Sequence, residues 1–441
     1  MTTSSRFTPN TAMAVVIANM IGTGVFTSLG YQLLDIKSVF PLMLLWLVGG
    51  LAALCGALSY AELCARLPRS GGEYHFLRET YHPAAGFISG WVSATVGFAA
   101  PTALAAMTFA GYLSSAVAGV VTLHEKALAV GLVLFLTLTH GFSRETSSRF
   151  QTIFTLIKVV LIVIFCGAVY FSVETPQSLN FLPVAGDWEL ISGGAFAVSL
   201  IYVNYAYTGW NAVTYITNEI EEPQKNIPRV MLLGTVLVMV LYLVLNAIFL
   251  YAAPMADMAG QIDIGVIVAK ASFGPSGAML MGITLSLLLI STVSAMVMAG
   301  PRVLQVVGED FRLFEWLAAM NAKGVPARAI NMQAIITIIF IVTSSFESVL
   351  VFSGFIMGFN TLIAVLGVFV LRFRSTDEEN KKVSYLTWGY PVTPLIYMGI
   401  MLWTLFFIVK HRPEEAAVGL VVIASGLIFY WLSRFLGSYK R

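Results

Sequence analysis

The sequence is poor in charged residues: Asp, Glu, Lys and Arg make up only 11% of its 441 residues, whereas hydrophobic residues make up 58%. A typical soluble domain carries roughly 25% charged residues, so this composition cannot supply an ordinary water-facing surface. The formal net charge is only +2, which gives no electrostatic reason to expect a nucleic-acid partner. These shortages argue against a soluble enzyme and favour a protein embedded in a lipid bilayer.

Cysteine and metal-binding patterns are scarce as well. The three cysteines, Cys55, Cys64 and Cys166, all lie in apolar runs, so a disulfide framework is not expected. The five histidines show no metal-ligand spacing, and the sequence contains no nucleotide-binding P-loop. We therefore expect no metal, no cofactor and no activity driven by ATP.

Long hydrophobic runs are what the sequence has in abundance. An apolar stretch of about 18 residues can cross a bilayer as a helix, and twelve such stretches are separated by polar loops. They cover residues 10–34, 39–66, 84–117, 125–142, 150–173, 190–218, 228–252, 276–305, 330–346, 348–372, 388–410 and 415–436. The pattern predicts an all-α polytopic membrane protein with twelve transmembrane helices, forming one domain over residues 1–441.

The basic residues predict the orientation, because Lys and Arg gather in cytoplasmic loops. If the N-terminus lies in the cytoplasm, 19 of the 25 basic residues fall in inner loops or tails and 5 fall in outer loops. The remaining one, Lys158, lies inside a span. Both termini are therefore expected in the cytoplasm, as an even number of spans requires.

Glycines interrupt two of the predicted spans. Gly22 and Gly24 lie near the middle of the first span, and Gly209 lies near the middle of the sixth, with Asn211 close by. Glycine weakens a helix, and interrupted spans at corresponding positions of two five-helix halves are typical of inverted-repeat transporters. The alternative is that Gly22 and Gly24 only allow close helix packing, although their spacing differs from the usual small-residue motif.

A helix break inside a membrane has a specific chemistry. Unwinding frees N–H groups at the start of one half-helix and carbonyls at the end of the other. The N–H end attracts a carboxylate and the carbonyl end attracts an ammonium group. Two facing breaks could therefore hold a zwitterionic α-amino acid without any charged side chain.

Several motifs carry a resemblance to a known family. They are IGTGVF at 21–26, YAEL at 60–63, PRSGGEY at 68–74, GWN at 209–211, NEIEEPQKNIPR at 218–229 and GVP at 324–326. In this order and spacing, the chain resembles the amino acid–polyamine–organocation transporter superfamily and, within it, the L-type amino acid transporter-like branch. The resemblance implies a LeuT-like fold. Its two inverted five-helix repeats would occupy 10–173 and 190–372, and 388–436 would hold two terminal helices.

The resemblance also implies an α-amino acid substrate between the first and sixth spans. The implied binding residues are Met20, Gly22, Thr23, Gly24, Tyr205, Thr208, Gly209 and Asn211. The amides of Gly22, Thr23 and Gly24 would bind the carboxylate. The carbonyls of Met20, Tyr205 and Thr208 would bind the ammonium group.

Two of these side chains have further interpretations. Tyr205 would be an aromatic lid over the substrate, or else a core tyrosine. Asn211 stands where relatives that handle arginine or diamines carry a glutamate, so its neutrality argues against a cationic substrate. Alternatively, Asn211 forms a hydrogen bond between helices. Glu62, four residues before Arg66, has the spacing of a helical ion pair, and we interpret it as structural.

Lys158 lies about 12 Å into the fifth span, at 1.5 Å per residue. A lysine at this depth costs roughly 2.5–3.5 kcal/mol on insertion scales. Its side chain could extend toward the cytoplasm. We favour the interpretation that it faces the bundle interior and meets carbonyls freed at the first break, where sodium-coupled relatives hold a cation. That interpretation predicts sodium-independent exchange, or proton coupling if Lys158 loses its proton.

The leading hypothesis is an amino acid transporter in the cell membrane that works by alternating access. An intramembrane enzyme would need paired catalytic groups at mid-membrane, but the only ionisable residue that the sequence indicates at depth is Lys158. A channel or a transporter of another substrate, such as an amine or a cationic amino acid, is the other alternative. Heteromeric members of the family link through an extracellular cysteine, and no cysteine lies in a predicted outer loop, so no disulfide-linked subunit is expected.

Overall fold

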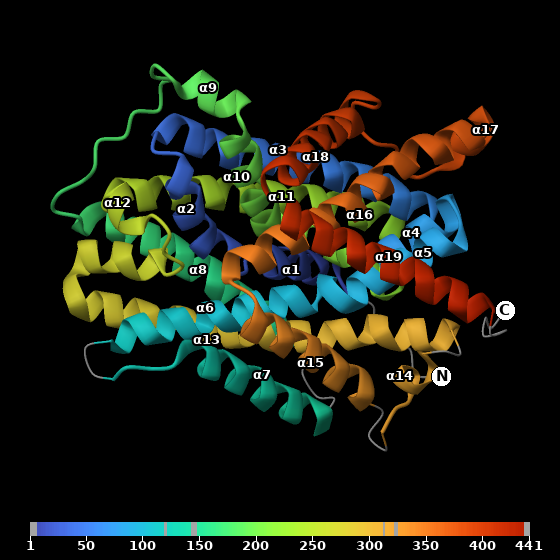
Figure 1. Ribbon diagram of the computed structural model, residues 1–441. Helices are drawn as coiled ribbons and strands as arrows, with labels where there is room; N and C mark the ends of the chain where they lie inside the picture. The colour runs from blue at the N-terminus through green and yellow to red at the C-terminus, as the bar shows by residue number, and fades with distance from the viewer. Residues whose placement is uncertain (1–6, 119–120, 143–147, 312–313, 322–324, 436–441) are drawn as a thin grey trace.

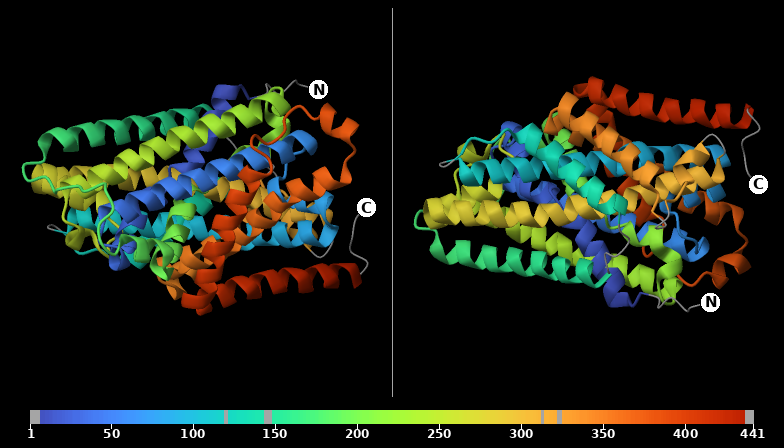
Figure 2. Two further views of the ribbon diagram at one scale, coloured as in Figure 1. Left: turned by 90° about the horizontal axis from the view of Figure 1, so that it is seen from above. Right: turned by 90° about the horizontal axis from the view of Figure 1, so that it is seen from below.

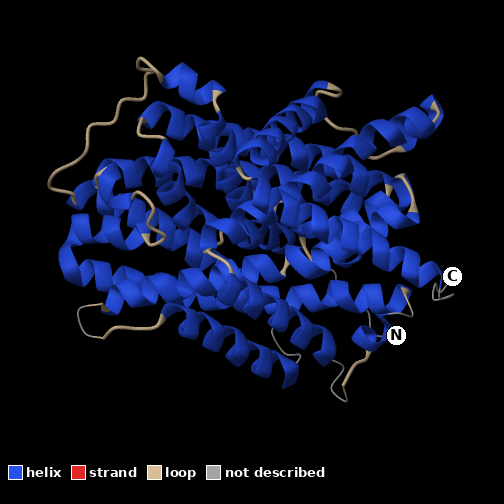
Figure 3. Cartoon of the chain, in the orientation of Figure 1, coloured by secondary structure: helices blue, strands red, loops and turns tan. Residues whose placement is uncertain are grey.

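Apolar sequence forms helices almost throughout. The computed structural model describes residues 7–118, 121–142, 148–311, 314–321 and 325–435. Every named element in these ranges is a helix (Figure 3). The longer ones are α1 Pro9–Met20, α2 Gly24–Asp35, α3 Val39–Arg66, α5 Pro83–Val92, α6 Ala99–Val117, α7 Glu125–Phe142, α8 Ser148–Ser172, α10 Gly194–Tyr207, α11 Pro223–Ala252, α13 Ile264–Asp310, α15 Ala327–Thr343, α16 Phe346–Arg374, α18 Val392–His411 and α19 Pro413–Phe435.

Short helices connect the long ones. They are α4 Gly72–Thr80, the π-helical turn η1 Ser93–Gly97, α9 Asp187–Ser192, the 3-10 helix η2 Ala212–Glu219, α12 Met255–Met258, α14 Glu315–Ala318 and α17 Asp377–Lys382. Three of them, α4, α14 and α17, lie in the long polar loops and gather at one end of the bundle with the end of α19, whereas α12 lies at the other end (Figure 1).

Nine helical segments of the described residues are long and apolar enough to cross a membrane. They are Pro9–Asp35, Val39–Arg66, Pro83–Val117, Thr155–Ser172, Pro223–Ala252, Ile264–Glu309, Phe346–Arg374, Val392–His411 and Pro413–Phe435. This confirms a polytopic membrane protein. The three other expected ranges contain α7, α10 and the shorter apolar helix α15. The count of exactly twelve crossings stays a prediction.

The outer surface of the bundle is apolar. On α8, Leu156, Ile164 and Phe171 are 64%, 60% and 85% exposed, although water would normally disfavour such exposure. Helices α8 and α19 lie on opposite faces of the bundle, as both views of Figure 2 show. These exposed side chains are suited to contact lipid tails, which are as apolar as leucine.

Both predicted helix breaks are present in the structure. The first span is divided into α1 and α2, and the sixth is divided into α10 and η2. The sequence did not indicate two further irregularities. The third span contains η1, and α13 bends at Gly274, where φ is +70°. The bend divides α13 into two helical parts. The part after Gly274 begins close to residue 276, where the apolar pattern placed the start of the span, and the part before it begins at Ile264.

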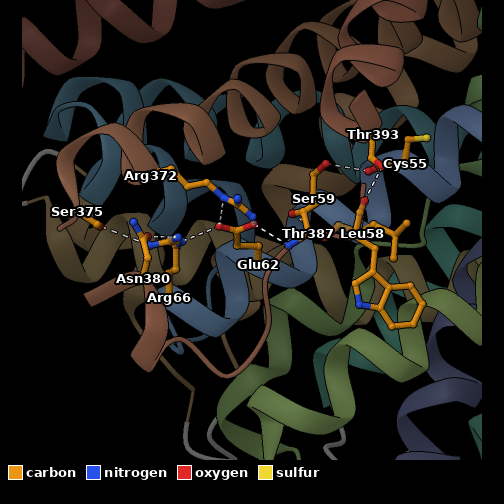
Figure 4. Close-up of polar contacts among 11 residues, drawn as sticks. Cys55, Leu58, Ser59, Glu62, Arg66, Arg372, Ser375, Asn380, Thr387 and Thr393 are labelled. Carbon is orange, nitrogen blue, oxygen red and sulfur yellow. Dashed lines mark hydrogen bonds and ion pairs between the residues drawn. The ribbon is translucent and has the colours of Figure 1, made fainter. Parts of the chain in front are cut away.

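The predicted ion pair between Glu62 and Arg66 is also confirmed, with 2.8 Å between Oε1 and Nε. Glu62 is fully buried and accepts two further hydrogen bonds from Arg372 and one from the Thr387 amide (Figure 4). Arg372 also stacks on the ring of Tyr390. One carboxylate therefore joins α3 to α16 and to the segment before α18, a role larger than a pair within one helix.

Candidate functional site

The first break lies between Met20 and Gly24. The amide of Gly22 turns back and donates to the Met20 carbonyl at 2.8 Å, and Phe26 donates to the Thr23 carbonyl at 3.0 Å. In the described part of the chain, the amides of Thr23 and Gly24 have no backbone acceptor. They lie at the start of α2, where the helix dipole is positive. Two of the three amides expected to bind a carboxylate are therefore available, and the third would have to leave Met20.

The glycines of the first break have different surroundings. A Cβ atom at Gly24 would lie 2.5 Å from Cα of Ala206, so the start of α2 packs directly against the end of α10. A Cβ atom at Gly22 would meet nothing within 4 Å. The packing interpretation of these glycines therefore fits Gly24, whereas Gly22 faces open space.

The second break brings the two broken helices into contact. Helix α10 ends at Tyr207, and Gly209 adopts a φ of +117°, which favours glycine. A Cβ atom at Gly209 would lie 2.6 Å from the backbone carbon of Asn19 in α1. Gly209 is thus required both for its backbone conformation and for the close approach to the first break.

Tyr242 of α11 connects both breaks, and sequence reasoning missed it. Its hydroxyl lies 2.5 Å from the Met20 carbonyl and 3.1 Å from the Ala206 carbonyl. It is fully buried and can donate its single proton to only one of the two at a time. A tyrosine in the middle of an apolar span was the only available signal, because its partners come from helices far away in sequence.

All eight predicted binding residues line one cavity of about 580 Å³. The cavity also reaches Arg69, Arg302 and part of α4, so it extends toward the end of the bundle where the basic loops lie. His75 of α4 is part of this wall, and burial lowers its pKa below the ordinary value of 6.5. Near pH 7 its imidazole is therefore neutral.

Tyr205 is 8% exposed and lines the cavity beside the break. The carbonyl of Tyr205 accepts from the Thr208 amide, and the Met20 carbonyl accepts from Gly22 and lies next to the Tyr242 hydroxyl. Of the three carbonyls expected to bind an ammonium group, only that of Thr208 has no hydrogen bond within the described residues.

Lys158 is 8% exposed and points into the bundle, as expected. Its Nζ donates to Thr292 Oγ1 of α13 at 2.9 Å. The hydrogen bonds of the described residues include none from Lys158 to the carbonyls of the first break. Lys158, Gly22 and Thr292 together line a second cavity of about 380 Å³, and Gly22 and Thr292 also line the first. The lysine is therefore next to the break, with a hydroxyl as its partner.

Asn211 makes the hydrogen bond between helices that was left as an alternative. Its Nδ2 donates to Glu73 Oε1 of α4 at 2.6 Å. Glu73 is only 2% exposed and lines the cavity. Glu73 is therefore a buried ionisable group in the cavity wall that the sequence did not indicate. Glu73 lies in the polar stretch PRSGGEY, which looked like a solvated loop, and α4 folds back under the cavity.

The arrangement offers backbone groups rather than a reactive centre. Within the described ranges, no group of three His, Cys, Asp or Glu side chains is placed to hold a metal ion. What the site presents is a set of helix-end amides and carbonyls around a partly polar cavity. Such a site is suited to bind a small polar molecule.

Comparison with known proteins identifies the family of this chain. The family model for amino acid permeases matches residues 7–432. The b(0,+)-type amino acid transporter 1 of Mus musculus is 27% identical over 95% of this chain and 86% of its own length. The large neutral amino acids transporter small subunit 2 of Homo sapiens is 27% identical over 97% of this chain and 79% of its own. The Asc-type amino acid transporter 1 of Mus musculus is 24% identical over 98% and 81%. The chain belongs to the amino acid permease family of the amino acid–polyamine–organocation superfamily.

Proposed function

We propose that this chain is a secondary transporter of neutral L-α-amino acids that works by alternating access at the plasma membrane. Its twelve spans would form two inverted repeats, over 10–173 and 190–372, followed by the helices of 388–436, with both termini in the cytoplasm. The observation that carries the proposal is the contact between two broken helices, whose ends line one cavity. Unwound helices at a repeat interface are the usual place for a transported solute.

The substrate carboxylate would bind at the start of α2. The free amides of Thr23 and Gly24 support this role, and the open space at Gly22 leaves room for the ligand. The Gly22 amide would join them by exchanging its bond to Met20 for one to the carboxylate. The close approach of Gly24 to Ala206 and of Gly209 to Asn19 keeps the positive end of α2 beside the carbonyl end of α10.

The substrate ammonium group would bind at the end of α10. The Thr208 carbonyl is the best-placed acceptor, because those of Tyr205 and Met20 already accept hydrogen bonds in this conformation. Tyr205 would cover the bound substrate. A substrate with both charges on one carbon satisfies both helix ends, whereas an amine satisfies only one.

Lys158 would act as a fixed cation beside the first break. Its burial and its place on a wall shared with Gly22 support that role. A tethered ammonium group removes the need for a sodium ion, so exchange without sodium is the proposed mechanism and proton coupling is the alternative. The chain would work without a disulfide-linked subunit, since Cys64 and Cys166 are buried and Cys55 is half-buried.

Counterflow in proteoliposomes tests the proposal. Vesicles are loaded with each amino acid in turn, and uptake of a labelled neutral amino acid is measured with and without sodium and with and without a pH gradient. We expect neutral amino acids on the far side to accelerate uptake, in the absence of sodium. A strict sodium requirement would overturn the role of Lys158, and no counterflow with any amino acid would overturn the proposed function.

A second candidate is a transporter of the same fold that takes cationic amino acids or amines. It is favoured by the buried Glu73 carboxylate in the cavity wall. In the same counterflow experiment, arginine or a diamine would then exchange faster than leucine.

A further inference from the structure

Glu73 accepts hydrogen bonds from three side chains, one on α3 and two at η2. Tyr60 of α3 donates to Oε1 at 3.0 Å, and Asn211 Nδ2 donates to the same oxygen at 2.6 Å. Tyr215 of η2 donates to Oε2 at 2.5 Å. All three contacts are made by a side chain that is 2% exposed. In all three contacts a carboxyl oxygen of Glu73 is the acceptor, so each of the three partners turns a donor toward it.

The hydrogen bond to Glu73 fixes the orientation of the Asn211 side chain. An amide carries donors on its nitrogen and acceptors on its oxygen, and the two atoms point apart. Because Nδ2 is bound to Glu73, Oδ1 is directed away from Glu73. Asn211 lines the substrate cavity, and its Oδ1 accepts no hydrogen bond from any residue that the structure describes. The oxygen is therefore available to a substrate.

We propose that Glu73 is a positioning residue that sets the hydrogen-bond polarity of Asn211. The Asn211 amide then presents its Oδ1 as an acceptor for an N–H or O–H donor of the substrate. This inference rests on the proposed function, because it concerns the same cavity.

The simpler explanation is that Glu73 only anchors α4 against η2 and α3. The two explanations predict different results. A purely structural anchor affects folding, or the transport rate of all substrates equally. A positioning residue changes KM and the preference between substrates, and its effect depends on what stands at position 211.

The first test removes the acceptor. In Glu73→Met the side chain keeps its approximate length, but it no longer accepts a hydrogen bond from the Asn211 amide. We expect KM for a neutral amino acid to rise roughly tenfold, which corresponds to about 1.4 kcal/mol, while the maximal rate per folded protein changes less. An unchanged KM with folded protein would overturn the proposal. Size-exclusion chromatography in detergent reports on folding.

A charge exchange within the pair remains informative even if Glu73→Met does not fold. Asn211→Asp places two carboxylates within hydrogen-bond distance, and their repulsion should impair transport at least about tenfold. The double variant Glu73→Gln with Asn211→Asp restores a donor opposite an acceptor, with the same total charge. We expect transport to recover and the preference for arginine over leucine to rise at least about tenfold, because the carboxylate now stands at position 211 in the second helix break instead of on α4.

These experiments distinguish a failure of the role of Glu73 from a failure of the proposed transport function. If the double variant is as impaired as Asn211→Asp, or recovers without any change of preference, Glu73 does not set the polarity of Asn211. If the wild-type protein shows no amino acid transport in the same vesicles, the proposed function fails before this inference is reached.

Discussion

The three glycines at the helix breaks have three different surroundings, although the sequence presents them as similar interruptions. Gly22 faces open space, Gly24 packs on Ala206, and Gly209 adopts a positive φ against Asn19. The sequence could predict where the helices break, because glycine weakens a helix wherever it stands. It could not predict which glycine is required for packing, because that depends on a neighbour from another helix.

Replacing these glycines by alanine should separate binding from packing. Gly22→Ala should fold normally and take up amino acids more slowly, because the methyl group enters the cavity beside the free amides. Gly24→Ala should lower the free energy of unfolding by about 1–3 kcal/mol, because its Cβ would overlap the Ala206 backbone. Thermal unfolding in detergent and uptake in vesicles measure the two effects. Normal uptake by Gly22→Ala would contradict the carboxylate site at this break.

Lys158 is the residue for which the sequence made the most specific prediction. The structure confirms that it is buried, and it places the ammonium group on Thr292. Its hydroxyl partner could not be predicted, because Thr292 lies 134 positions away in the sequence.

Lys158→Met should slow exchange at least about tenfold while the protein stays folded, since the partner that Lys158 leaves behind is the neutral hydroxyl of Thr292. Lys410→Met, at an exposed lysine near the end of α18, serves as a control and should behave like the wild type. Initial rates of counterflow measure the effect. Equal rates for the Lys158→Met variant and the wild type would mean that the lysine has no part in transport.

At the scale of helices, the Glu62 network shows that an ion pair predicted within one helix can stabilise the fold more than its i, i+4 spacing suggests. Four hydrogen bonds from two arginines and a backbone amide meet on one buried carboxylate. The i, i+4 spacing predicted the bond to Arg66. Arg372 and the Thr387 amide could not be predicted, because helix packing brings them to Glu62.

Glu62→Leu should therefore lower the free energy of unfolding by about 3–5 kcal/mol, because it leaves two arginines without their carboxylate. The matched control is Glu222→Leu, which breaks the exposed pair with Lys225 and should leave the melting temperature unchanged. Thermal unfolding of both variants in the same detergent provides the comparison. If the Glu62→Leu variant melted at the same temperature as the Glu222→Leu variant, the buried network would not stabilise the bundle.

At the scale of the whole molecule, the apolar pattern predicted the helical membrane fold, and the structure and the family agree with it. The pattern failed where polar sequence is buried. Helix α4 looked like a solvated loop, yet it carries Glu73 into the cavity wall. The bend at Gly274 and the π-helical turn in the third span leave the apolar pattern almost unchanged, so periodicity cannot reveal them.

The cavity reaches the end of the bundle that carries the basic loops, so its side chains should be accessible from the cytoplasm. Ala299 of α13 lines the cavity. In a Cys55→Ala background, Ala299→Cys should react with a membrane-impermeant thiol reagent in inside-out vesicles, and the transported amino acid should slow the reaction. Reaction only in right-side-out vesicles would reverse the proposed orientation.

The central claim is that backbone groups at two broken helices recognise both charges of an α-amino acid. Competition against uptake of the best neutral substrate, by its methyl ester, its decarboxylated amine and its deaminated acid, tests this most directly. Because a site built for hydrogen bonds rejects ligands that leave those bonds unmade, we expect each analogue to inhibit at least about 100-fold more weakly than the amino acid. Inhibition by the amine or the ester as strong as that by the amino acid would contradict recognition of the carboxylate by the Thr23 and Gly24 amides.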